Sequence, residues 1–179
     1  MQIRLARPQD VKQIRKVSLG LTISANSISP ESGFVEYKTP SEKELEQRIK
    51  RSKFFYVAEK NKFIIGFCSA YSNKILKELD FSNDEIVNYL LKRYSDFVYW
   101  DLLGVKKESQ RQRIGTQLIK VFLDAVNKAD YKTIMGPISH FPHRNEISIK
   151  LLNKLDFFLE GEIAVYNTMK FGIYKKEFT

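Results

Sequence analysis

A strand, a polar turn and a long helix follow one another in residues 97–129, and this segment constrains the fold more than any other. The apolar run at 97–105 ends at Val105, and from Gln110 apolar residues recur at helical spacing as far as Ala129. Unpaired N–H groups and the positive dipole end at the start of a helix favour a bound anion. The turn and first helical residues add five basic side chains: Lys106, Lys107, Arg111, Arg113 and Lys120. We therefore expect a phosphate site where the helix begins, near Gln110.

Residues 110–116, QRQRIGT, resemble the Q/R-x-x-G-x-G/A signature of the GCN5-related N-acetyltransferases. In that family the signature holds the pyrophosphate of acetyl-CoA at a strand-to-helix turn. Arg113 stands where the first glycine is usual, so its side chain must point away from the coenzyme or offer a guanidinium to a phosphate. Gly115 keeps the second glycine, where the missing Cβ lets a ligand approach the backbone closely.

Residues 145–157 resemble the second signature of the same family, N-x-x-[AS]-x-x-L-Y-x-K-x-G-F. Leu152 replaces the tyrosine that protonates the leaving thiolate in many relatives, and leucine cannot donate a proton. Tyr99 or Tyr166 could serve instead, or the thiolate could leave unaided, since a thiol pKa is about 8.5. Asp156 replaces the usual turn glycine, which its tolerance of left-handed backbone allows.

The resemblance implies a single α+β domain over residues 1–179, with a mixed, largely antiparallel sheet of about seven strands flanked by about four to five helices. It implies acetyl transfer from acetyl-CoA to a primary amine of a small molecule or a peptide by direct attack. Cys68 lies away from the cofactor turn and has no evident activating partner. The implied cofactor-binding residues are Leu103, Val105, Gln110, Arg111, Gln112, Arg113, Ile114, Gly115, Thr116, Asn145 and Ser148. Asn145 could equally cap the helix that it begins.

The candidate base is Asp101, with His140 second because an imidazole titrates near neutrality. Strand alternation puts Asp101 on the same face as Tyr99, Leu103 and Val105, which the resemblance places against the cofactor arm. The alternative is a strand-end Asp that bonds backbone or a lysine. We expect no metal, because His140 and His143 lack a third ligand and Pro142 breaks the helix that would align them.

Periodicity and turn residues predict the remaining elements. The first part of the chain is predicted to contain a strand at 3–5, a helix from Pro8 to Leu21, a loop at 22–40 and a helix capped by Ser41–Glu44. A hairpin of 54–58 and 63–71 follows, with a bulge or close contact at Gly66, and then a helical insertion at 73–97 capped by Ser82–Glu85. The last part contains a strand at 131–138 parallel to 97–105, a helix at 145–155, and closing strands at 157–166 and 168–174.

The insertion at 73–97 either packs against the body or covers the acceptor as a lid. Gly104 fits a bulge, a close approach or relief of packing beneath it.

The net charge of +9 is spread along both halves of the chain, and no nucleic-acid-binding motif is present. Nucleic-acid binding is therefore the weakest alternative, behind a coenzyme A-binding module without turnover, which Arg113 and Leu152 would suit. A single cysteine, no membrane-length apolar run and no signal-like start predict a cytoplasmic protein. The closing strands could present an edge to a second copy in a homodimer.

Overall fold

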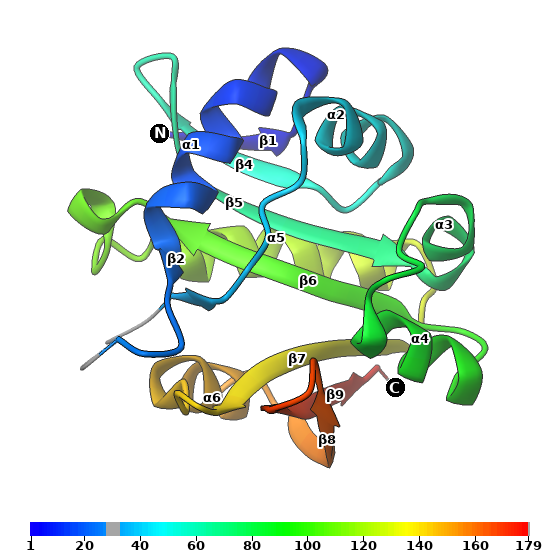
Figure 1. The fold of residues 1–179 in the computed structure, drawn as a ribbon. Coiled ribbons are helices and arrows are strands. Elements are labelled where there is room, and N and C mark those ends of the chain that lie inside the picture. The colour runs from blue at the N-terminus through cyan, green and yellow to red at the C-terminus, as the bar shows by residue number, and fades with distance from the viewer. Residues whose placement is uncertain (28–32, 179) are drawn as a thin grey trace.

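The computed structural model describes residues 1–27 and 33–178 as a sheet covered by helices (Figure 1). The sheet has seven strands in the order β1-β4-β5-β6-β7-β9-β8. Their bounds are β1 Gln2–Leu5, β4 Tyr56–Lys60, β5 Phe63–Ser72, β6 Val98–Val105, β7 Thr133–Phe141, β8 Phe158–Val165 and β9 Met169–Glu177. All neighbours are antiparallel except β6 and β7, as the sequence predicts.

The described residues form six α-helices, one more than the upper end of the prediction. They are α1 Val11–Leu21, α2 Glu42–Arg51, α3 Asn73–Glu78, α4 Glu85–Arg93, α5 Ile114–Lys128 and α6 Glu146–Asn153, with short 3₁₀ turns η1 Pro8–Asp10 and η2 Lys107–Ser109. The first four helices bury their apolar stripes on one face of the sheet and α5 and α6 on the other, which gives two cores. The added helix arises because the segment at 73–97 contains both α3 and α4.

Strands β6 and β7 pair only at their beginnings and then separate (Figure 1). The parallel ladder joins Val98 to Ile134 and Tyr99 to Met135, and it ends there. Farther along β7, Pro137 has no N–H group to give to a neighbour. Strand β7 instead pairs with β9 along its length. The sheet is therefore open between its two middle strands, beyond Tyr99.

Asp101 is a β-bulge residue, and this corrects the predicted alternation of side chains along β6. Ser69 of β5 pairs with Leu102, whereas the next residue, Ala70, pairs with Trp100, so Asp101 is the extra residue. Leu102 consequently faces the same core as Tyr99, while Leu103 and Val105 face the other core with Trp100. Asp101 therefore does not share a face with Leu103 and Val105.

Other local predictions are partly corrected. Helix α5 begins at Ile114 and not near Gln110, because Arg111 and Arg113 both have left-handed backbone, with φ of 62° and 61°. The cap of α4 is Asp84 and not Ser82: Asp84 Oδ1 accepts from the N–H groups of Ile86 and Val87 at 3.0 and 2.9 Å.

The segment predicted as a loop at 22–40 contains a short parallel pair, β2 Thr22–Ile23 and β3 Phe34–Val35. Its residues 28–32 lie outside the described part of the chain.

Three predictions about single residues are confirmed. Asp156 has φ of 60°, in the left-handed region. Gly66 lies beside a bulge in β5. It is also a close contact, because a Cβ added at Gly66 would lie 2.9 Å from Gly104 O. At Gly104 a Cβ would lie 2.9 Å from both Leu21 Cδ1 and Phe67 Cε1, so this glycine relieves packing beneath the strand.

Candidate functional site

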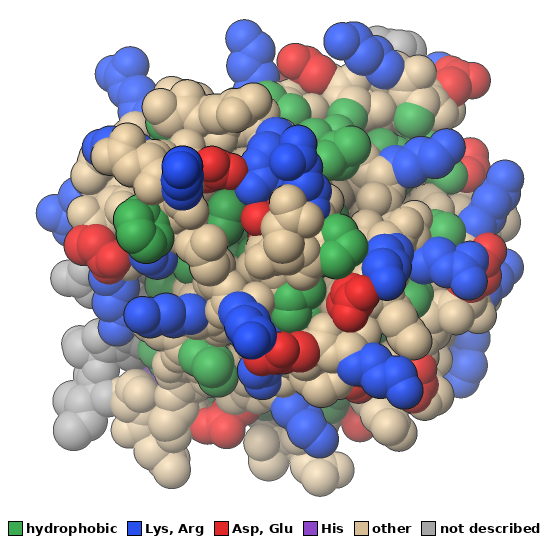
Figure 2. Space-filling view, turned by 90° about the horizontal axis from the view of Figure 1, so that it is seen from above, with side chains coloured by type: hydrophobic (Ala, Val, Ile, Leu, Met, Phe, Trp, Pro, Cys, Tyr) green, Lys and Arg blue, Asp and Glu red, His purple; other side chains and the backbone are tan. Residues whose placement is uncertain are grey.

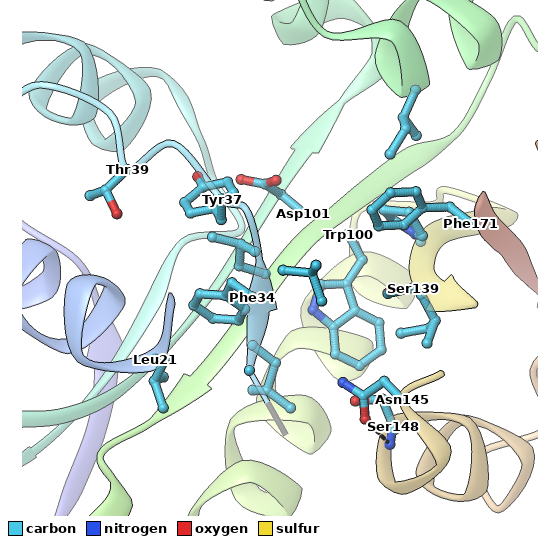
Figure 3. A pocket seen from close by; sticks show the side chains of 18 of the residues that line it. Leu21, Phe34, Tyr37, Thr39, Trp100, Asp101, Ser139, Asn145, Ser148 and Phe171 are labelled. Atoms are coloured by element: carbon cyan, nitrogen blue, oxygen red, sulfur yellow. Dashed lines mark hydrogen bonds between the residues drawn. The ribbon is translucent and has the colours of Figure 1, made fainter. Parts of the chain in front are cut away.

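A cavity of about 1490 Å³ follows the opening between β6 and β7. It runs from the start of α5 and the start of α6 at one end to α2, α4 and the β8–β9 turn at the other. Figure 3 shows Trp100 and Asp101 of β6 between these two ends, with Asn145 and Ser148 on one side and Tyr37 on the other. All of the predicted cofactor-binding residues except Gln112 line this one cavity.

The start of α5 borders the cavity with backbone N–H groups that have no partner among the described residues. The first helical donor is Gln117 N–H, which bonds to Arg113 O at 3.1 Å, so Ile114, Gly115 and Thr116 precede the helical hydrogen bonds. Gln110 Nε2 donates to Val105 O at 3.0 Å and ties the turn to the end of β6. This end of the cavity therefore has the donors and the helix dipole that a diphosphate requires.

Packing against the described residues does not explain the glycine at position 115. A Cβ there would lie 3.7 Å from Leu103 Cδ2 and 3.9 Å from Val105 Cγ2, which are ordinary contacts. Both neighbours line the cavity, so the Cβ would occupy space beside the cavity wall. A glycine that the described packing does not require, next to N–H groups without a described partner, fits close approach of a phosphate-bearing group.

Asp101 lies in the cavity wall, and its side chain is 8% exposed. Its Oδ2 accepts from Ser69 Oγ at 3.2 Å and lies 4.0 Å from Arg48 Nη1. Burial raises the pKa of Asp101 from 3.8 to about 6, although Arg48 acts in the opposite direction. Arg48 is itself held by the ring of Phe81, 4.2 Å from the guanidinium. Asp101 is thus a carboxylate at neutral pH that binds a proton more readily than an exposed aspartate.

Both candidate proton donors line the cavity. Burial raises the pKa of Tyr99 well above 10, so its hydroxyl keeps its proton at neutral pH. Burial and Asp84 raise the pKa of Tyr166, whose hydroxyl donates to Asp84 Oδ1 at 3.0 Å. Tyr99 is therefore a neutral hydroxyl deep in the sheet, whereas the Tyr166 proton is already committed to a carboxylate.

The start of α6 borders the same end of the cavity as the start of α5. Asn145 caps this helix, because its Oδ1 accepts from Ser148 N–H at 3.0 Å, which confirms the capping role. The N–H of Asn145 in turn donates to Ser139 O at 3.0 Å and ties α6 to β7. Leu152 also lines the cavity, so an aliphatic side chain lies in the wall where relatives have a tyrosine.

His140 does not line the cavity with the other candidates. Its side chain is 3% exposed, its Nδ1 contacts Glu162 and its Nε2 lies 3.1 Å from Tyr174 Oη. It packs over Gly172 on the neighbouring strand, where a Cβ would collide with the imidazole ring. The structure therefore gives His140 a place between β7, β8 and β9, apart from Asp101. Among residues 1–27 and 33–178, no group of three His, Cys, Asp or Glu side chains could hold a metal ion.

Sequence reasoning missed several residues of this site: Arg48, Ser69, Asp84 and Ser139. They come from α2, β5, the start of α4 and β7. Arg48, Asp84 and Ser139 line the cavity, whereas Ser69 reaches the site through its hydrogen bond to Asp101. Asp84 lies within the predicted cap segment Ser82–Glu85, but nothing in the sequence indicates that it would bond Tyr166, 82 residues away. The other three carried no local signal.

On the face of the molecule shown in Figure 2, the basic side chains form no single patch. In Figure 2 the Lys and Arg side chains are scattered over the face shown, with Asp and Glu among them. This arrangement does not favour the nucleic-acid alternative. None of the helices in the described part of the chain is both long and apolar enough to cross a bilayer.

The model of the acetyltransferase (GNAT) family matches residues 24–157. Similar solved structures include Ard1 of Thermoplasma volcanium, with TM-score 0.68, 13% identity, and 98% of this chain and 96% of that chain covered. Arabidopsis thaliana Naa50, in complex with the bisubstrate analogue CoA-Ac-MVNAL, has TM-score 0.67, 18% identity and coverage of 99% and 98%. The yncA protein of Salmonella typhimurium, with its cofactor acetyl-CoA, has TM-score 0.66, 15% identity and coverage of 99% and 93%. No curated protein matches the chain significantly in sequence.

Proposed function

The chain belongs to the acetyltransferase (GNAT) family, and from this premise we propose that it transfers an acetyl group from acetyl-CoA to a primary amine of a small molecule or a peptide. One observation carries the proposal: a single cavity joins the unpaired N–H groups at the start of α5 to the buried carboxylate of Asp101. Two of the similar structures, Naa50 and yncA, contain a coenzyme A conjugate or acetyl-CoA, which supports the choice of donor.

The chain's own residues would hold the donor by its phosphates and its arm. The turn at 110–116 offers backbone N–H groups to the diphosphate, and Arg111 and Arg113 add positive charge. The backbone of Leu103 and Val105, with Asn145 and Ser148 opposite, lines the path of the arm. When bound, acetyl-CoA supplies an activated acetyl group.

Asp101 takes the proton that the acceptor must lose. An alkylamine with a pKa near 10.4 is mostly protonated at pH 7, and the gap of about 3.4 units corresponds to roughly 4.6 kcal/mol. The raised pKa of Asp101, about 6, makes this carboxylate a better proton acceptor than an exposed aspartate. Ser69 and Arg48 hold the carboxylate in place while it does so. The amine then attacks directly, because Cys68 is fully buried and its raised pKa keeps it a thiol.

Tyr99 is the better of the two tyrosines for protonating the leaving thiolate. Its hydroxyl has a raised pKa and so retains a proton to donate, whereas Tyr166 gives its hydrogen bond to Asp84. Leu152 contributes only an apolar surface. His140 remains a sequence prediction, which its contacts with Glu162 and Tyr174 do not support.

The test is thiol release from acetyl-CoA with a panel of primary amines, for the wild type and Asp101→Asn. We expect kcat to fall about a hundredfold or more in the variant, the usual contribution of a general base. In the wild type kcat/KM should fall as pH drops through about 6, because Asp101 becomes protonated. Asp124→Asn, an exposed aspartate on α5, is the matched control. Unchanged turnover in Asp101→Asn would refute the role of Asp101.

A coenzyme A-binding module without turnover is the second candidate. It is favoured by Leu152, which puts no proton donor in the wall at that position. It predicts that coenzyme A raises the melting temperature while no amine releases thiol. A cytoplasmic location and a homodimer stay predictions from the sequence.

A further inference from the structure

Asp84 brings a second carboxylate to the cavity, from the segment at 73–97 that the sequence predicts as an insertion. Its Oδ1 accepts three hydrogen bonds, from the N–H groups of Ile86 and Val87 at 3.0 and 2.9 Å and from Tyr166 Oη at 3.0 Å. Its Oδ2 has no hydrogen-bond partner among the described residues. The fold therefore fixes this carboxylate through one oxygen and leaves the other oxygen to a ligand.

The basic side chains that line this part of the cavity do not neutralise Asp84. Arg48 lies beside Asp101, at 4.0 Å, and Arg15 pairs with a glutamate of α2 at 3.9 Å. Lys38 is exposed. Asp84 forms no ion pair with any side chain of the described residues. The cavity thus holds one carboxylate with a basic neighbour, Asp101, and one without a counter-ion, Asp84.

Tyr99 gives independent evidence that a polar ligand binds between these two carboxylates. Its side chain is 2% exposed and lines the cavity, and its hydroxyl has no hydrogen-bond partner among the described residues. Burial, Asp84 and Asp101 all raise the pKa of this hydroxyl, which therefore lies within electrostatic reach of both carboxylates. A buried hydroxyl without a hydrogen bond is unfavourable. Its oxygen can accept a hydrogen from a ligand while it keeps its own proton.

Aromatic side chains make up much of the wall around the two carboxylates (Figure 3). Aromatic faces attract ammonium groups and also pack against methylene groups. Two carboxylates in an aromatic wall are therefore complementary to a flexible apolar chain with a cation at each end. The aromatic residues concerned are Phe34, Tyr37, Phe81, Tyr99, Tyr166 and Phe171.

We propose that the acceptor is an aliphatic diamine, whose reacting amine lies at Asp101 and whose second ammonium binds Asp84 Oδ2. The reacting nitrogen gives its proton to Asp101, whereas the second nitrogen stays protonated, because an alkylamine pKa near 10.4 lies well above neutral pH. The helical insertion thus supplies the residue that selects the acceptor. This inference rests on the proposed function, because it assumes that Asp101 receives the reacting amine.

Calorimetric titration of amines into the protein saturated with coenzyme A tests the proposal without turnover. The diaminoalkanes from diaminopropane to diaminohexane are each compared with the monoamine and the aminoalcohol of equal length, at neutral pH. The best diamine should bind about tenfold more tightly than its monoamine or more, the usual contribution of a hydrogen bond to a charged group. The aminoalcohol should bind like the monoamine, because its hydroxyl carries no charge.

Asp84→Asn removes the charge and keeps the helix cap, because asparagine caps a helix as well as aspartate does. In this variant the advantage of the diamine over its monoamine should fall to within about twofold. The ratio of the two affinities is taken within each protein, so any effect common to both amines cancels.

Asp80→Asn is the matched control. It removes a carboxylate from the wall of the same cavity, but Asp80 is exposed and its Oδ1 accepts from Ser82 Oγ at 2.7 Å. The advantage of the diamine should stay within about twofold of the wild type, because water and salt screen an exposed charge.

The inference is overturned if no diamine binds more tightly than its monoamine, or if the advantage survives in Asp84→Asn. It is also overturned if the aminoalcohol binds as tightly as the diamine, or if Asp80→Asn loses the advantage to the same extent as Asp84→Asn. The proposed function fails separately: wild type that releases no thiol from acetyl-CoA with any amine would refute transfer, while the affinities would still decide whether Asp84 binds the second ammonium.

Discussion

Replacing the proposed base Asp101 by asparagine should make the free protein more stable at neutral pH. Burial raises the pKa of Asp101 from 3.8 to about 6, so ionising this carboxyl is harder in the folded than in the unfolded chain. The difference of about 2.2 units, at 1.36 kcal/mol per unit, makes ionised Asp101 cost the fold about 3 kcal/mol. Asparagine has nearly the same shape, can still accept from Ser69 Oγ and carries no charge.

The sign follows from proton linkage. Between pH 3.8 and about 6 the folded chain holds a proton on Asp101 that the unfolded chain has lost. The stability contributed by this group is therefore complete below pH 3.8 and is lost as pH rises through about 6. The stability advantage of Asp101→Asn should be larger by about 2 kcal/mol at pH 8 than at pH 4.5, because the cost of ionisation is about 3 and about 1 kcal/mol at these two values.

Urea denaturation of both proteins at pH 4.5 and pH 8 gives the four free energies of unfolding. Titrations shared by the two proteins cancel in the difference between them. A difference that is the same at both pH values would refute the reasoning. So would a variant that loses stability relative to wild type as pH rises, because Arg48 would then stabilise the carboxylate more than burial destabilises it.

Four further substitutions test other predictions about the site and the residues around it. Gly115→Ala should raise the free energy of unfolding by up to about 1 kcal/mol and weaken coenzyme A binding at least tenfold. Gly104→Ala should instead lower the free energy of unfolding by about 1–3 kcal/mol, because a Cβ has no room there. Urea denaturation measures the stability of both variants, and calorimetric titration measures coenzyme A binding. Arg113→Gly should stabilise the protein by about 0.5–1 kcal/mol in urea denaturation, since φ is 61° there and glycine adopts it without strain. His140→Gln should keep kcat within about threefold in the thiol-release assay; a hundredfold loss would reinstate His140 as the base.

The sequence predicts the parts of this fold that depend on local patterns. The apolar spacing of α5 and the capping residues Ser41 and Asn145 act within a few residues, and the structure confirms them. Asp156 likewise follows from a local need for left-handed backbone. The resemblance to an acetyltransferase family adds the order of the elements, which no short pattern contains.

The parts that sequence reasoning missed depend on pairing between distant segments. The bulge at Asp101 exists because the register between β5 and β6 shifts by one residue after Ser69. No pattern within β6 indicates this shift. Arg48 reaches Asp101 only because α2 packs over that end of the sheet. The Ser139 hydroxyl, which has no partner among the described residues, lies beyond the point where β7 leaves β6. Strand alternation therefore selected Asp101, which the structure places in the cavity wall, through an incorrect assignment of its face.

A crystal structure of the protein with coenzyme A bound would test the central claim most directly. We predict that the diphosphate accepts hydrogen bonds from the backbone N–H groups of residues 114–116, and that the arm runs between β6 and β7 with the thiol toward Asp101. Coenzyme A bound outside this cavity, or no binding at saturating concentration, would contradict the account.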